Sequence, residues 1–307
     1  MKGKPKDIAA SVRQRLLNQA RERNEDFTYT LVKYGIERLL YRLSRSDCQS
    51  RFILKGATLF AVWTGAAHRP TRDVDFLSYG QVSSMEVNRL FSEVISISCK
   101  DDGLQFLPDT IKVIDIRENE IYRGLRVTLT CQLGSAKIPL QADIGFGDAI
   151  TPPPVEISLP SLLGLPEAVL LSYPMEAVVA EKFEALVKLA MGNTRMKDFF
   201  DLFFMANSFA FESDRLRSSL KATFDRRGTL LPGALPIALT RAFWESSEKN
   251  DQWQAFLRRT RLLEPGLSLQ TVCIRIGDFL IPIVQESNDD SSRQWTPEMG
   301  WHQSEQV

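Results

Sequence analysis

Residues 51–77 read RFILKGATLFAVWTGAAHRPTRDVDFL, and no other stretch says as much about the fold. Residues 51–55 are typical of a short buried strand, which Gly56 interrupts, and residues 58–63 follow with helical spacing. Residues 73–77 alternate polar and apolar side chains, as a strand with one buried face does. The stretch therefore predicts a strand, a tight turn, a short helix and a second strand.

Two aspartates in this stretch form the first candidate site. A strand would place Asp73 and Asp75 on one face and Val74 on the other. Carboxylates this close repel each other, so such a pair is either solvated at a strand end or holds a divalent cation. Gly56 favours the cation, because a residue without a Cβ lets the backbone approach a ligand. A helix beginning at Ala57 would direct its N–H groups towards the same place.

The turn before the short helix is the candidate site for the phosphates of a nucleotide. It comprises Lys55, Gly56, Ala57 and Thr58. Arg72 is a further candidate for a phosphate contact, because its guanidinium stays charged and stands next to Asp73. A phosphate chain between this turn and a carboxylate-bound Mg²⁺ would make a coherent site.

A third carboxylate lies further along the chain. In residues 138–146, IPLQADIGF, the even positions are apolar or small, so Asp143 should lie on the opposite face of a strand. An acidic side chain inside a strand is unfavourable unless it is paired, exposed or bound to a metal. Carboxylates from two strands, Asp73, Asp75 and Asp143, could hold two Mg²⁺ ions. One would bind the triphosphate and the other would activate an attacking hydroxyl.

The rest of the chain predicts an α+β fold with a small mixed sheet, flanking helices and a mainly helical C-terminal domain. We expect N-terminal helices in residues 1–50, the sheet core in 51–160, the helical domain in 161–285 and a polar, flexible tail in 286–307. The prolines at 152–154 should begin a linker, and Trp244 and Trp253 should lie in the helical core.

Composition narrows the class of protein. Hydrophobic residues make up 44% of the 307 residues and charged residues 25%, which excludes bulk disorder. The 38 Lys plus Arg balance 38 Asp plus Glu, which excludes a uniformly basic coat. Four dispersed cysteines imply neither a zinc ribbon nor a disulfide framework, and two histidines exclude a multi-histidine metal centre. The absence of a long apolar run argues against a membrane span. We expect a cytoplasmic monomer.

Three stretches together resemble a known family. They are YGIERLLYRLSRSDCQSRFILKGATLFAVWTGAAHRPTRDVDFL (34–77), QADIGFGD (141–148) and AEKFEALVKLAMGNTRMKDFFDLFFM (180–205). They look like the AbiEii/AbiGii nucleotidyltransferase toxins of the DNA polymerase β-like nucleotidyltransferase superfamily. The motif of that superfamily is a glycine-containing turn followed by D-x-D or D-x-E. The resemblance runs from about residue 11 to beyond residue 206.

The resemblance implies roles for individual residues. It makes Asp73 and Asp75 metal ligands and Asp143 the third carboxylate, with one or two Mg²⁺ ions and an NTP substrate. It also implies that Lys182 contacts nucleotide phosphate and that Asp198 is an essential helical acid. The superfamily usually has Gly-Gly or Gly-Ser at the turn. Here an alanine follows the glycine, and the next residue, a threonine, could supply the hydroxyl.

The residues themselves leave the role of Lys182 open. It shares an apolar helix face with Val178 and Leu186, so its ammonium needs a phosphate, a core acid or a path to solvent along its own stem. Asp198 and Asp201 lie three residues apart on one predicted helix, where an internal ion-pair network is the alternative to a catalytic role.

The resemblance implies the toxin of a bacterial toxin–antitoxin or phage-defence system. Its antitoxin, a protein or an RNA, would come from a neighbouring gene. The enzyme would add nucleotides to an RNA acceptor, the 3′ end of tRNA, and so block translation. Arginines expected to follow an RNA backbone are Arg38, Arg42, Arg45, Arg226, Arg227, Arg258 and Arg259. Two alternatives remain: transfer to a protein hydroxyl or a small molecule, and a non-catalytic nucleotide-binding module. The complete set of three carboxylates argues against the second.

Overall fold

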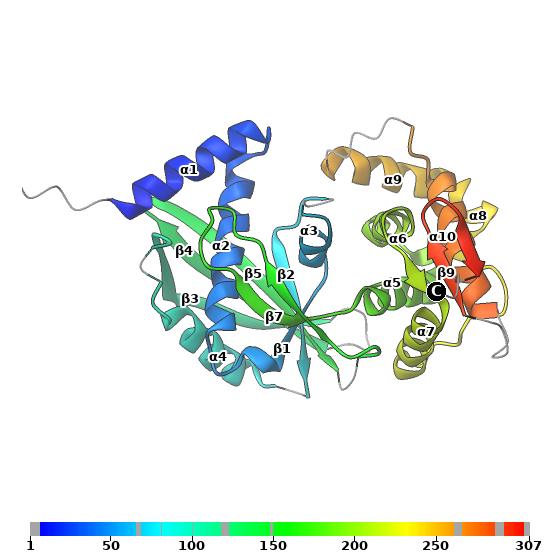
Figure 1. Cartoon of the computed structure of the whole chain (residues 1–307), viewed down its shortest axis with the longest axis horizontal. Coiled ribbons are helices and arrows are strands. Elements are labelled where there is room, and N and C mark those ends of the chain that lie inside the picture. Colours follow the sequence, from blue (N-terminus) through cyan, green and yellow to red (C-terminus); the bar gives the residue numbers. More distant parts are fainter. Residues whose placement is uncertain are drawn as a thin grey trace, which may run out of the picture. The chain divides into compact units, whose positions relative to one another are not determined.

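The computed structural model describes residues 7–65, 69–80, 82–99, 101–117, 123–147, 150–260, 266–285 and 292–303. The chain divides into two compact units. The first comprises residues 1–149 and 155–172, and the second comprises residues 150–154 and 173–307. Figure 1 shows the sheet and helices of the first unit and the helices of the second.

Two long helices open the first unit. α1 (Ile8–Glu22) begins after Asp7, and α2 (Phe27–Ser44) begins after Asp26. Each aspartate accepts a backbone N–H from the first turn of its helix, as N-cap residues do. Val12, Leu16 and Ala20 of α1, which recur every four positions, are buried, whereas Ile8 at the start of the helix is exposed.

A mixed sheet forms the centre of this unit. Over the described residues it has seven strands in the order β3-β4-β5-β2-β1-β7-β6. They are β1 (Phe52–Lys55), β2 (Asp73–Tyr79), β3 (Leu104–Arg117), β4 (Arg123–Leu133), β5 (Ala136–Gly147), β6 (Val155–Leu159) and β7 (Ala168–Ser172). β2 pairs in parallel with β5 and β1 in parallel with β7, and the other neighbours are antiparallel. The α+β fold expected from the sequence is confirmed.

The elements around the candidate site agree with the sequence pattern. The strand–turn–helix–strand order appears as β1, α3 (Thr58–Thr64) and β2. α4 (Ser84–Ser96) lies between β2 and β3, and a turn at Gly134 and Ser135 joins β4 to β5.

The sheet has one apolar and one polar face. Gly35 of α2 lies against Leu140 of β5, where an added Cβ would come within 2.8 Å of Leu140 Cδ2. Leu140, Ala142 and Ile144 are all buried on the face that α2 covers. Asp143, at an intervening position, therefore points to the opposite face. This opposite face carries the candidate site.

Two strands of this unit were not predicted. The sequence suggested a linker after residues 152–154, but β6 and β7 extend the sheet beyond β1. Each has five residues, too few for the alternation to stand out among the surrounding prolines. The first unit consequently ends at Ser172 rather than at residue 160. It also includes the N-terminal helices, because α2 packs against β5 and β7.

The second unit is mainly helical, as expected. Its helices are α5 (Met175–Leu189), α6 (Met196–Ser208), α7 (Ser213–Arg227), α8 (Arg241–Trp244), α9 (Ser247–Thr260) and α10 (Leu269–Gln285). α5 packs against α7, and α6 packs against α10. Aromatic rings fill the core: Phe199 stacks on Phe243 with 5.2 Å between ring centroids, and Trp253 is fully buried as predicted. In the described ranges, no helix is long and apolar enough to span a membrane.

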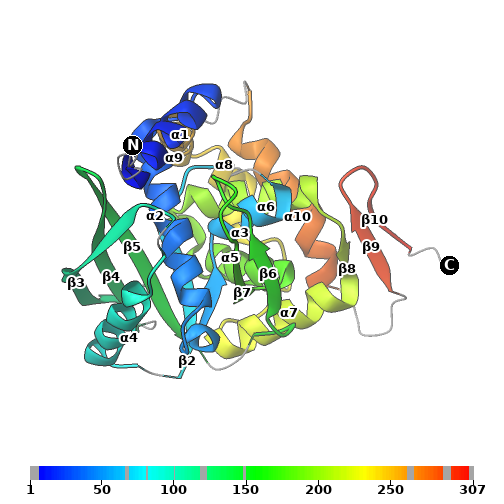
Figure 2. The ribbon, with the colours of Figure 1, turned by 60° about the vertical axis from the view of Figure 1, so that its left-hand side comes forward.

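The residues assigned to a flexible tail contain ordered structure. β9 (Arg293–Thr296) and β10 (Gly300–Gln303) form a hairpin that pairs with β8 (Phe211–Glu212) (Figure 2). Trp295 is buried, and its ring centroid lies 4.9 Å from that of Phe279 on α10. Its Nε1 donates to the carbonyl of Ala206 at 2.9 Å. Burial of this aromatic surface orders a segment whose composition is otherwise polar.

Candidate active site

Asp73 and Asp75 lie on the polar face of the sheet, at the start of β2. They alternate with Val74, which is fully buried on the other face. The two aspartates therefore lie on one face of the strand, as the sequence predicts. The hydroxyl of Thr71 donates to Asp73 Oδ1 at 2.6 Å. The two carboxylates are partly exposed and therefore accessible to a ligand.

The position of Asp75 explains why the turn has a glycine at residue 56. Gly56 has a φ of +76°, and a Cβ added to it would lie 2.0 Å from Asp75 Oδ2. The carboxylate of Asp75 thus rests directly against the backbone of the turn. The sequence argument expected a ligand to approach this glycine, but the group that approaches it is a side chain of the site itself.

Replacing Gly56 with alanine is expected to destabilise the protein and to displace Asp75. The positive φ should lower the free energy of unfolding of the alanine variant by about 1 kcal/mol. The overlap of the new Cβ with Asp75 should lower it by a further ~1–3 kcal/mol. Thermal denaturation and a nucleotidyl-transfer assay measure the two effects.

Gly134→Ala is the matched control for this change. Gly134 has a φ of +60°, but an added Cβ meets no atom within 4 Å. The Gly134→Ala variant should lose only the stability that the positive φ costs, and it should keep its activity. If both variants lost stability and activity equally, the close approach of Asp75 would have no part in the effect.

Asp143 is bound by an arginine that the sequence analysis did not consider. Arg126 of β4 donates from Nε to Asp143 Oδ1 at 2.8 Å and from Nη2 to Oδ2 at 2.7 Å. The hydrogen bond to Asp143 raises the pKa of Arg126, partial burial opposes this, and the charges of Asp73 and Asp75 add to the rise. A sequence signal existed, because Gly134-Ser135 is typical of a hairpin turn. Arg126 lies eight residues before Gly134 and Asp143 lies eight residues after Ser135, so this turn makes them partners.

The carboxylates fit one divalent cation better than two. Asp73 and Asp75 offer carboxylate oxygens on one strand face, the ligand type that Mg²⁺ prefers. Both oxygens of Asp143 accept hydrogen bonds from Arg126. Within the described ranges, no group of three or more His, Cys, Asp or Glu side chains is arranged to hold a metal ion. The centre of three carboxylates around one or two ions stays a prediction.

The remaining residues predicted to bind the nucleotide surround the turn. An added Cβ at Gly145 of β5 would lie 3.5 Å from Lys55 Nζ, so the lysine extends over the polar face. Arg72 is exposed just before β2. Ala57 is buried and Thr58 is half-buried at the start of α3, which has seven residues.

A cavity of about 630 Å³ adjoins this turn within the first unit. Its lining includes Ala57, Thr58 and Thr71, the last being the residue that bonds Asp73. Most of the remaining lining comes from α2, α3 and residues 159–162 and is apolar. Its volume falls in the range of pockets that hold small ligands. No local pattern in the sequence predicts this cavity, because its walls come from segments far apart in the chain.

Lys182 lies in a buried ion-pair cluster of the second unit. Its Nζ is 2.8 Å from Asp198 Oδ1 and 2.7 Å from Asp201 Oδ2. Arg195 Nε lies 2.7 Å from the other oxygen of Asp198. The carboxylates are almost completely buried, whereas the lysine side chain is 13% exposed. The sequence left three environments open for the ammonium of Lys182: a phosphate, a core acid or solvent. In the structure it pairs with core acids.

The charge of Asp198 is held by this cluster. Burial alone would raise its pKa, but the charges of Lys182 and Arg195 together bring the pKa below its usual value. Asp198 is therefore ionised at neutral pH and fixes the ammonium of Lys182.

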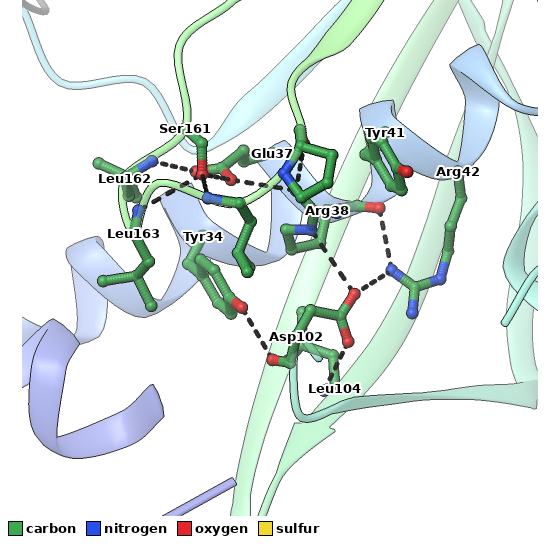
Figure 3. Close-up of polar contacts among 12 residues, drawn as sticks. Tyr34, Glu37, Arg38, Tyr41, Arg42, Asp102, Leu104, Ser161, Leu162 and Leu163 are labelled. Carbon is green, nitrogen blue, oxygen red and sulfur yellow. Dashed lines mark hydrogen bonds and ion pairs between the residues drawn. The ribbon is translucent and has the colours of Figure 1, made fainter. Parts of the chain in front are cut away.

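Two arginines expected on an RNA-binding surface are buried instead. Arg38 and Arg42 of α2 are 2% and 3% exposed. Arg42 Nη1 lies 2.7 Å from Asp102 Oδ2, and Arg38 Nε lies 3.5 Å from the same oxygen (Figure 3). Arg38 also donates to the carbonyl of Pro166, so these groups tie α2 to two distant segments. The expectation of a basic RNA-binding face on α2 is wrong at these two positions.

The arginines later in the chain are of two kinds, some in ion pairs and some exposed. Arg226 and Arg227 pair with Glu181 at 3.1 and 3.3 Å, and Arg227 also pairs with Glu184. Arg258 and Arg259 are exposed at the end of α9, as Arg45 is at the end of α2. These three arginines are exposed surface charges.

Comparison with known families identifies the chain. Residues 38–273 match the family described as nucleotidyl transferase AbiEii toxin, type IV toxin–antitoxin system. The chain belongs to the AbiEii family. It is therefore a nucleotidyltransferase, and the resemblance seen in the sequence is confirmed. The matched range includes the turn, the three carboxylates and the Lys182 cluster.

Two crystal structures from Helicobacter pylori are similar to this AbiEii chain. One, described as a candidate nucleotidyltransferase, is 14% identical with a TM-score of 0.45 and covers 83% of this chain and 92% of its own. The other, JHP933, is 15% identical with a TM-score of 0.44 and covers 81% and 87%. Among curated proteins, none matches this chain. The assignment to the AbiEii family rests on the family match.

The residues predicted for the AbiEii site fall into two groups. On the polar face of the first unit, the structure brings together Lys55, Asp73, Asp75 and Asp143, with Gly56 beneath Asp75. In the second unit, it brings together Lys182 and Asp198.

Proposed function

We propose that this AbiEii protein is an Mg²⁺-dependent nucleotidyltransferase that adds nucleotides from an NTP to an RNA acceptor, the 3′ end of tRNA. The observation that supports this best is the pair Asp73 and Asp75 on one strand face, held against the glycine turn. In the reaction, the 3′ hydroxyl oxygen of the acceptor bonds to the α-phosphorus and pyrophosphate leaves. The hydroxyl proton is released to solvent.

Individual residues of the first unit would have separate roles in this reaction. Asp73 and Asp75 would hold the cation, which when bound supplies positive charge to the phosphates. Lys55 and Arg72 would bind phosphate oxygens around the turn at residues 56–58. The adjoining cavity has the volume and the apolar walls that suit the nucleoside part of the substrate.

Lys182 would contribute a further phosphate contact, as the resemblance implies. Its pairing with Asp198 and Asp201 supports this role, because two buried carboxylates keep the ammonium charged and fixed in one orientation. We assign Asp198 the role of holding Lys182, with Asp143 as the third carboxylate of the site.

The biological role would be that of a toxin that blocks translation in the cytoplasm as a monomer. An antitoxin, protein or RNA, from a neighbouring gene would restrain it, in keeping with the family description. The alternative acceptors are a protein hydroxyl and a small molecule.

Incubation with total tRNA and each labelled NTP in turn tests the proposal. We expect Mg²⁺-dependent labelling of tRNA by at least one NTP, lost when periodate has oxidised the 3′ end of the tRNA. Because each neutralised phosphate releases counterions, labelling should fall at least about tenfold between about 50 and 200 mM salt.

The same reaction distinguishes the alternatives. Labelling that survives periodate treatment, or that appears only on protein, would contradict the tRNA proposal and support the protein acceptor. Labelling of a small molecule should depend only weakly on salt.

A further inference from the structure

Four charged side chains lie in register on four neighbouring strands of the polar face. Arg126 of β4 is the partner of Asp143 on β5, and Asp143 is the partner of Asp75 on β2. Asp75 is in turn the partner of Lys55 on β1. The row runs positive, negative, negative, positive across β4, β5, β2 and β1, so its formal charges cancel.

The arginine at one end of this row contacts both oxygens of its carboxylate. Both oxygens of Asp143 accept hydrogen bonds from Arg126, at 2.8 and 2.7 Å. A guanidinium matches a carboxylate in this bidentate geometry, which fixes the position of the acid. The side chain of Asp143 is 15% exposed and that of Arg126 is 36% exposed. Asp143 is thus neutralised by the protein before any ligand arrives.

The charge balance of the face favours one cation. Asp73 adds one negative charge to the row, so the five side chains carry two positive and three negative formal charges, a total of −1. One divalent cation would bring this to +1, and a second would bring it to +3. Charges of one sign crowded into a partly buried site repel strongly, so a second cation would bind weakly beside Arg126.

We propose that this enzyme binds a single divalent cation on Asp73 and Asp75, and that the guanidinium of Arg126 takes the place of a second. The inference rests on the proposed function, because it concerns the cation that nucleotidyl transfer uses. In this arrangement Arg126 fixes and neutralises Asp143. A guanidinium has five N–H donors, so those that Asp143 does not use are available for phosphate oxygens.

The number of Mn²⁺ ions bound by the full-length protein tests the inference without any reaction. Free Mn²⁺ is measured by electron paramagnetic resonance during a titration in the absence of nucleotide. The wild type should bind one ion per chain. Arg126→Met should bind two, the second at least about tenfold more tightly than any second ion on the wild type, because Asp143 is then an unpaired carboxylate.

Three variants identify which side chains hold the ions. Arg126→Lys keeps a positive charge beside Asp143 and should bind one ion. The double variant Arg126→Met with Asp143→Asn should also return to one ion, since the second ligand is removed. Asp73→Asn should abolish the site of the wild type. As a second measurement, the melting temperature of Arg126→Met should rise more with Mn²⁺ than that of the wild type.

The outcomes separate this inference from the proposed function. Two ions on the wild type, or one ion of unchanged affinity on folded Arg126→Met, would overturn the role of Arg126 while leaving the Asp73–Asp75 site in place. A folded wild type that binds no Mn²⁺ would overturn both, because the cation site itself would be missing.

Discussion

Nucleotidyl transfer should fall by at least about 1,000-fold when Asp73 is replaced by asparagine, a loss of about 4 kcal/mol of transition-state stabilisation. The change is isosteric, and an asparagine oxygen can still accept the hydrogen bond that Thr71 donates to Asp73 Oδ1 at 2.6 Å. What the variant loses is one of the two negative charges proposed to hold the cation. Asp73 and Asp75 repel each other, so the melting temperature should be kept or slightly raised.

Asp115→Asn is the matched control for this prediction. Asp115 is an exposed aspartate on β3 of the same sheet, away from the row of charges on β1, β2, β4 and β5. Its replacement removes the same charge and should leave both activity and stability unchanged. Labelling of tRNA by the Asp73 variant at the rate of the wild type would contradict the assignment of Asp73 as a cation ligand.

Lys182→Met should produce the largest loss of stability. The change keeps an apolar stem but leaves Asp198 and Asp201, 1% and 0% exposed, without the ammonium that both now contact. Removing one partner of a buried ion pair costs about 3–5 kcal/mol, which corresponds to a fall in melting temperature of about 10 °C for a unit of this size. Activity should fall as well, because a phosphate contact is lost.

Two further variants separate packing from catalysis at Lys182. Lys197→Met removes an exposed lysine from the same helix as the two acids and should be neutral. Lys182→Met combined with Asp201→Asn removes one of the uncompensated charges, so it should recover part of the stability but none of the activity. Recovery of both would show that Lys182 acts on the fold alone, and an unchanged melting temperature in the single variant would show that the cluster contributes nothing to stability.

The local sequence pattern was sufficient to predict the elements that form the polar face of the sheet. The spacing in residues 51–77 predicted β1, the turn, α3 and β2, because apolar periodicity and a glycine act over a few residues. Alternation placed Asp73 and Asp75 on one face and Asp143 on the polar face of β5, since the period of a strand is two. The hairpin turn at residues 134–135 also determined that Arg126 faces Asp143, although only the structure drew attention to it.

Contacts between segments far apart in the chain needed the tertiary structure. Arg38 and Arg42 look like a basic surface in sequence, and their burial depends on Asp102, about sixty residues away. β6 and β7 join the sheet because β1 offers an open edge, and Trp295 orders the hairpin because α10 offers an aromatic surface. In each case the side chain or strand has two physically acceptable environments, solvent or a partner. Local sequence does not distinguish them, because the partner exists only once the chain has folded.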